Sequence, residues 1–117
     1  MFQIDGTKIT MSRGDTGAFK VRATGYTFAE NDRAIFSVKN SSGAVVLSKI
    51  YAMTDNIFRV VFHNPDTDYL PAGKYSWDVR YVVDPHYDEH GNIDDGDQVS
   101  TPKLPQELEL KPVVGEV

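Results

Sequence analysis

The chain has 117 residues, the size of one domain, and it is 40% hydrophobic, 25% charged and free of cysteine. This composition excludes a disordered tail, disulfide bonds, thiolate metal sites and a cysteine nucleophile. The formal net charge of -5 argues against binding to a nucleic-acid backbone, because that role needs a dense cationic face.

The N-terminal residues 1–6 lack both the basic leader and the apolar stretch of a secretory signal. The longest aliphatic run, residues 44–47, is far shorter than the roughly 20 residues of a membrane-spanning helix. Without a secretion route, the glycosylation pattern at residues 40–42 is a chance match. We therefore expect a protein made in the cytoplasm, with one domain over residues 1–117 and no membrane partner.

Apolar and polar side chains alternate along four segments, which is typical of strands with one packed face and one wetted face. The packed sets are Phe19, Val21 and Ala23; Ala34, Phe36 and Val38; Phe58, Val60 and Phe62; and Tyr75, Trp77, Val79, Tyr81 and Val83. We predict strands near residues 7–11, 16–24, 33–39, 44–51, 57–63, 74–83 and 97–110, the last one broken at Pro102 or Pro105. Residues 40–43 predict a tight hairpin, and no segment has sustained helical spacing.

The segment before residue 77 resembles the corner that leads into the penultimate strand of immunoglobulin-like domains. There a tyrosine hydroxyl bonds to upstream backbone, and a core residue follows two positions later. Tyr75 would be the corner residue, and Trp77 would stand where antibody domains have a cysteine. The alternative is simply two aromatic residues on a buried face. The predicted fold is all-β: an antiparallel immunoglobulin-like β-sandwich of about seven strands.

Residues 84–97 concentrate the negative charge, and with Pro85, Gly91 and Gly96 they predict a loop between the last strands. The acidic residues of this segment are Asp84, Asp88, Glu89, Asp94, Asp95 and Asp97. Outside it the chain is nearly balanced. The argument against nucleic acid therefore depends on the absence of a clustered basic stripe.

Calcium prefers oxygen ligands at alternating positions, with glycine at the turn. The acidic segment offers Asp88, Asn92, Asp94 and Asp97. However, His90 and Ile93 occupy positions where the EF-hand pattern needs an oxygen ligand and a glycine. A solvated hairpin loop explains this stretch better than a calcium site.

His86 and His90 have the spacing of two zinc ligands on one helical face. Pro85 and Gly91 disfavour a helix there, and Tyr87 stands where the usual motif has glutamate. We predict no metal site and no cofactor.

Nucleophilic catalysis needs a serine or threonine beside a histidine base and an orienting acid. The chain has no Gly-x-Ser-x-Gly motif, and His63 shares a predicted strand face with Arg59 and Val61, as a sheet-surface residue would. A sandwich of this size also leaves little room for a cleft. We predict no catalytic residues and a protein that is not an enzyme.

Two further features have a functional and a structural explanation. Arg13, Gly14 and Asp15 form the tripeptide that integrins bind, but before a strand they predict a turn in which Asp15 bonds the following backbone. Aromatic residues are numerous enough for a carbohydrate-binding or adhesive module, which calcium could stabilise; this is our alternative function. The aromatic residues concerned are Tyr26, Phe28, Tyr51, Tyr69, Tyr81 and Tyr87.

Two stretches, taken together, carry a family resemblance. They are residues 11–21 (MSRGDTGAFKV) followed by 34–39 (AIFSVK), and residues 66–80 (DTDYLPAGKYSWDVR) followed by 96–102 (GDQVSTP). Together they resemble small phage and prophage proteins of Gram-positive bacteria, similar to the N-terminal domain of the siphophage baseplate upper protein. The resemblance covers roughly residues 9–110.

The resemblance implies an immunoglobulin-like sandwich with a structural, non-catalytic role in a phage tail or baseplate. It implies other virion proteins or further copies of the chain as partners. It also implies a location in the bacterial cytoplasm before assembly and in the virion afterwards.

Overall fold

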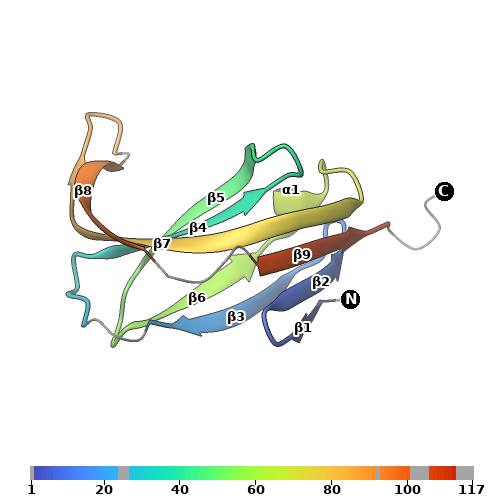
Figure 1. The fold of residues 1–117 in the computed structure, drawn as a ribbon, viewed down its shortest axis with the longest axis horizontal. Helices are drawn as coiled ribbons and strands as arrows, with labels where there is room; N and C mark the ends of the chain where they lie inside the picture. Colours follow the sequence, from blue (N-terminus) through green and yellow to red (C-terminus); the bar gives the residue numbers. More distant parts are fainter. Residues whose placement is uncertain (1, 24–26, 92, 101–105, 113–117) are drawn as a thin grey trace.

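The computed structural model describes residues 2–23, 27–91, 93–100 and 106–112, and for residues 93–100 the description covers the backbone. This part of the chain is almost entirely β-structure (Figure 1). Its elements are β1 (Gln3–Asp5), β2 (Lys8–Ser12), β3 (Gly17–Arg22), β4 (Arg33–Lys39), β5 (Val45–Ala52), β6 (Ile57–Phe62), α1 (Asn64–Thr67), β7 (Gly73–Tyr87), β8 (Ile93–Ser100) and β9 (Gln106–Lys111). In these described residues no helix is long and apolar enough to cross a membrane.

The strands form two sheets that face each other. The large sheet has the order β1-β2-β9-β7-β4-β5, with β8 also paired to β7, and the small sheet consists of β3 and β6 (Figure 1). In immunoglobulin-like sandwiches one sheet has three strands in the order of β9-β7-β4, and the variable type adds a strand at the place of β5. Strands β3 and β6 belong to the other sheet, as they do here. The predicted all-β sandwich is confirmed.

One ladder departs from the antiparallel prediction. β2 pairs with β9 in parallel, with Ile9 opposite Leu108 and Met11 opposite Leu110. Parallel neighbours need a long connection, and here nearly the whole chain separates the two strands. The short strand β1, which pairs with β2, was not predicted, since three exposed residues give no alternation to detect.

The predicted loop at residues 84–97 is wrong over most of its length. β7 continues to Tyr87 and β8 begins at Ile93, so most of this segment is a two-stranded hairpin. The ladder is irregular between Val83 and His86, where Asp84 has φ 50°. Pro85 lies in this irregularity, so its missing N–H interrupts no ladder bond and the strand resumes beyond it.

The predicted strand at residues 97–110 is likewise two strands, β8 and β9, and both pair with β7. The break predicted at Pro102 or Pro105 falls on residues 101–105, which lie outside the described residues. The other predicted strands agree with β2 to β6 within a few residues.

The core lies between the sheets and is filled by the alternating side chains. Phe36 of β4 packs against Phe62 of β6 with ring centroids 5.8 Å apart, and Phe19 of β3 packs edge-on against Phe36 at 6.0 Å. Each fully buried large apolar side chain stabilises the fold by roughly 1.5–3 kcal/mol relative to an exposed one. These contacts across the sandwich hold the small sheet of β3 and β6 against the large sheet.

The corner before β7 is confirmed. The Tyr75 hydroxyl donates a hydrogen bond of 2.7 Å to the carbonyl oxygen of Pro71. Trp77 packs against Phe19 with ring centroids 5.8 Å apart, so an aromatic pair links the two sheets. The Trp77 indole Nε1–H donates to the Thr7 carbonyl at 3.0 Å, so its polar end is satisfied as well.

The hairpin predicted at residues 40–43 is also confirmed and joins β4 to β5. The Asn40 Oδ1 accepts the backbone N–H groups of Ser42 at 3.1 Å and Ala44 at 3.0 Å, and Gly43 has φ 86°. The asparagine of the glycosylation pattern therefore has a structural role as the residue that shapes this turn.

Candidate functional site

The most prominent feature outside the sandwich is the far end of the β7–β8 hairpin. The last residue of β7 that pairs with β4 is Val82, and beyond it the ladder partner of β7 is β8, with His86 opposite Asp95 and Tyr87 opposite Ile93. In Figure 1 this part rises away from the body at the upper left. We call residues 84–91 and 93–97 the acidic arm.

A buried carboxylate holds the base of the acidic arm. Asp32 is only 3% exposed, and its Oδ1 accepts the backbone N–H of Asp84 at 2.9 Å. Its Oδ2 accepts the N–H of Ala29 at 2.7 Å, and the Asn31 amide donates to Asp84 Oδ1 at 3.2 Å. Asp32 thus stabilises the positive φ of Asp84, which sets the direction of the acidic arm.

The tip of the acidic arm is a turn with accessible charge. The Asp88 carboxylate accepts the N–H of His90 at 2.9 Å, and the Asp88 backbone carbonyl accepts the N–H of Gly91 at 3.1 Å. The Glu89 side chain is 87% exposed and Tyr87 is 48% exposed. The tip therefore presents a carboxylate and an aromatic ring to solvent.

The geometry of the tip does not support the zinc spacing. His86 lies in β7 and His90 in the turn, so the two imidazoles do not share a helical face. No cluster of three or more metal-ligating acids or histidines occurs among the described residues. Of the calcium ligands considered, Asn92 and the side chains of Asp94 and Asp97 lie outside what the structure describes.

A second feature lies on the outer face of the small sheet. Lys20 of β3 stands directly opposite Arg59 of β6, and Arg22 follows two residues along β3, opposite Ile57. All three cations are exposed, because Phe19, Val21, Phe58 and Val60 alternate with them and pack inward. We call Lys20, Arg22 and Arg59 the basic stripe.

Among the described residues, the basic stripe differs from most other basic residues in the partners of its side chains. Within the described residues, its three side chains make no ion pair or hydrogen bond, a property shared by Arg80 of β7. The remaining described lysines pair with carboxylates, and Arg13 and Arg33 donate to backbone carbonyls.

The basic stripe also corrects a prediction. The sequence was expected to contain no clustered basic stripe, yet the pairing of β3 with β6 brings Arg59 beside Lys20 and Arg22. Alternation places each of these residues on a wetted face. It does not show which two strands are neighbours, and that information was needed to find the cluster.

The tripeptide at residues 13–15 is a structural turn, as predicted. Arg13 Nη2 donates to the Asp68 carbonyl at 2.9 Å, and the Gly14 N–H donates to the Thr67 hydroxyl at 2.9 Å. The Asp15 carboxylate accepts the N–H of the preceding Ser12 at 2.8 Å. These contacts anchor the turn to the segment around α1.

His63 lies just beyond the strand on which it was placed. β6 ends at Phe62, and the His63 N–H donates to the Asp66 carboxylate at 2.7 Å, at the start of α1. The same carboxylate holds Lys49 Nζ at 2.6 Å. His63 is exposed and belongs to this helix start.

The aromatic residues considered for carbohydrate binding are dispersed. Phe28 stacks on the buried Tyr81 with ring centroids 4.7 Å apart, and Tyr51 stacks on Phe58 at 5.7 Å, in and against the core. Tyr69 is 60% exposed with its hydroxyl on the Val46 carbonyl at 2.6 Å. Tyr87 lies on the acidic arm, and Tyr26 lies outside the described residues. The described members therefore form no common platform.

Comparison with known proteins finds no relative of this chain: no protein-family model, no curated protein and no solved structure matches it. Two surfaces of the fold are therefore the candidate functional sites. One is the acidic arm, which lies beyond the sandwich, and the other is the basic stripe on the small sheet.

Proposed function

We propose that this chain is a non-catalytic structural protein of a phage or prophage tail or baseplate, where it joins an assembly through surfaces outside its core. The observation that carries the proposal is the acidic arm. None of its described residues belongs to the hydrophobic core. Two strands that pair only with each other are marginally stable in water, so such an arm gains most from contact with another protein.

The edge of the large sheet supports the same role. β5 is its last strand, and Val45 and Ile50 on this strand are exposed large apolar residues. Its one charged side chain, Lys49, turns to the Val61 carbonyl and the Asp66 carboxylate. Edges are commonly protected by charges, proline or bulges, and an apolar edge favours pairing with a neighbouring chain.

The assignment to phage particles comes from the sequence resemblance. Its matched stretches correspond to the turn at residues 13–15, to β3 and β4, and to the corner at Tyr75. These elements build the sandwich, so the resemblance supports a shared fold and setting and assigns no site residue.

Gene neighbourhood tests the phage assignment directly. We expect genes for tail, tape-measure or holin proteins beside the gene of this chain. A neighbourhood of metabolic or polysaccharide genes without any of these would overturn the assignment. We also expect no signal on a glycan array, because the described aromatic residues form no platform; specific glycan binding would favour the carbohydrate-binding alternative instead.

A further inference from the structure

We infer that copies of this chain associate head to tail, with the acidic arm of one copy on the basic stripe of the next. The inference rests on the proposed assembly function and names its partner as a second copy of the chain. Two surfaces of opposite charge carry the inference.

The basic stripe is a surface that favours an anionic partner. Lys20 and Arg59 are a directly opposed cross-strand pair, and like charges in that position destabilise a sheet. In the large sheet, by contrast, charged residues of neighbouring strands have opposite signs. There Lys8 lies 3.6 Å from Glu109 and 3.9 Å from Glu107, so charges on adjacent strands neutralise one another. The small sheet has no such neutralisation among its described residues.

The acidic arm is the complementary surface. It holds six of the seventeen acidic residues of the chain and no lysine or arginine. Glu89 at its tip is 87% exposed. Tyr87, 48% exposed, adds a ring on which an arginine of the basic stripe can stack, since guanidinium groups are attracted to aromatic faces. The acidic arm can therefore supply both the charge and the apolar contact that the stripe lacks.

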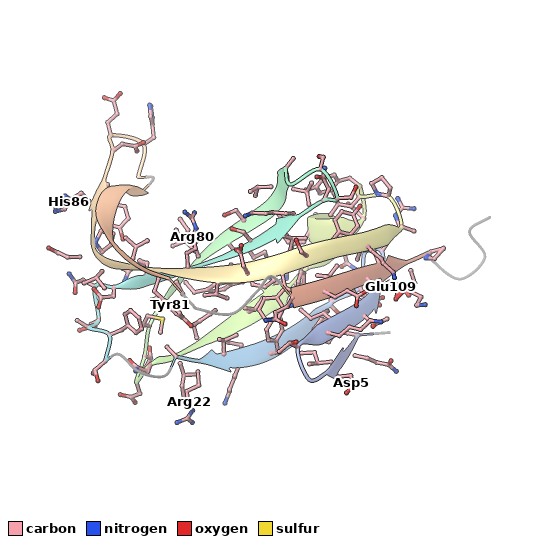
Figure 2. All side chains as sticks on the ribbon, viewed as in Figure 1. Asp5, Arg22, Arg80, Tyr81, His86 and Glu109 are labelled. Atoms are coloured by element: carbon pink, nitrogen blue, oxygen red, sulfur yellow. The ribbon has the colours of Figure 1, made fainter. Side chains whose placement is uncertain are left out.

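The two surfaces lie on different sides of the molecule. In Figure 2 His86 on the acidic arm is at the upper left, whereas Arg22 on the basic stripe is at the bottom of the molecule. A contact between two different patches on identical chains is heterologous, and its repetition gives a closed ring or an open filament. Such a repeating contact is suited to an assembly built from many copies.

A polyanion such as nucleic acid is the other anion that could occupy the basic stripe. Three cations neutralise few phosphates, and the acidic arm would repel the polyanion. A second copy is favoured because it brings the opposite charge on an arm of its own. The experiment below distinguishes the two occupants.

The test exchanges the charges of the two surfaces in the full chain. One variant reverses the stripe (Lys20→Glu with Arg59→Glu), and the other reverses the tip of the arm (Asp88→Lys with Glu89→Lys). We expect the natural chain to self-associate in sedimentation velocity at low ionic strength and to dissociate at high salt, because salt screens exposed charges. Each variant alone should remain monomeric. Their equimolar mixture should associate again, since the unchanged arm of the stripe variant then meets the unchanged stripe of the arm variant.

Arg59→Glu and Arg80→Glu form the matched control, because both replace an exposed strand arginine that has no side-chain partner within the described residues. We expect Arg59→Glu to weaken association about tenfold and Arg80→Glu to change it less than about twofold. Circular dichroism and thermal unfolding show that each variant is folded.

Three results would overturn the inference. They are a natural chain that stays monomeric at low salt, equal effects of the two arginine variants, and a mixture that does not associate. Single-stranded DNA binding that is lost on reversing the stripe, without rescue in the mixture, would assign the stripe to a polyanion. None of these results alters the gene-neighbourhood test, so failure of this inference and failure of the proposed function are distinguishable.

Discussion

The Tyr75 hydroxyl connects the start of β7 to the turn before it through its 2.7 Å bond to the Pro71 carbonyl. We expect Tyr75→Phe to lower the free energy of unfolding by about 1 kcal/mol, the usual net value of one hydrogen bond. Urea denaturation measures this change.

Tyr69→Phe is the control for Tyr75→Phe. It removes a similar phenol-to-carbonyl bond, but from a side chain that is 60% exposed. Water replaces the lost partner there, so the cost should be smaller. An equal or larger cost for Tyr69→Phe would contradict the explanation by burial.

Gly17 at the start of β3 leaves room for the ring of Phe2, which an added Cβ would overlap. Phe2 packs against Phe19 at 6.4 Å and Phe62 at 6.0 Å between ring centroids, at the margin of the core. We expect Gly17→Ala to displace this ring and to cost about 1–3 kcal/mol, as overpacking does. In a Phe2→Ala background the added methyl group should cost little. Additive effects in this double-mutant cycle, measured by denaturation, would show that the two sites are independent.

At the scale of elements, Asp32 links the segment before β4 to the base of the acidic arm. The two carboxylate oxygens of Asp32 each accept a backbone N–H, one from Asp84 and one from Ala29. In Asp32→Asn one of these oxygens becomes an NH2 group, which places a donor against one of the two N–H groups. We expect a loss of about 1–3 kcal/mol in unfolding free energy. Hydrogen exchange of the Asp84 amide should also become faster, which reports on the arm itself.

Asp55→Asn provides the comparison for Asp32→Asn. Asp55 is exposed in a turn at φ 52°, a conformation that asparagine adopts readily. The free energy of unfolding of the Asp55→Asn variant should stay within about 0.5 kcal/mol of that of the natural chain. If Asp32→Asn is equally mild, Asp32 does not hold the arm.

The elements also show how far local pattern extends. Alternation located β3, β4, β6 and the start of β7 to within a few residues, since the pleat of a strand acts on neighbours in sequence. It failed at Asp84 and Pro85, where composition indicated a loop. In the structure both residues lie at an irregular step of the β7–β8 ladder, and pairing with β8 continues beyond them.

At the scale of the whole molecule, stability should depend on alkaline pH through Tyr81, which is buried, and Tyr75, which is partly buried. Burial raises the pKa of Tyr81 above its ordinary value of about 10. Burial also raises the pKa of Tyr75, against a smaller opposing effect of Arg13.

The sign follows from proton linkage. Below about pH 10 these phenols are protonated in both the folded and the unfolded chain, so they cost no stability. As the pH rises further, the unfolded chain loses its protons first, and the free energy of unfolding falls until the folded pKa is passed. We expect urea midpoints to decrease above about pH 10, and Tyr81→Phe to decrease less. An identical decrease in Tyr81→Phe would contradict the assignment to Tyr81.

The sequence by itself determined most strands of the sandwich, which side of each of these strands packs, and the corner at Tyr75. These depend on neighbours within a few residues, through the pleat and through one local hydrogen bond. Tertiary structure alone decided that β2 lies parallel to β9, that the negatively charged segment extends as a paired arm, and that Lys20 faces Arg59. Strand pairing joins residues far apart in the chain, and the charges that a pairing brings together carry no local signal.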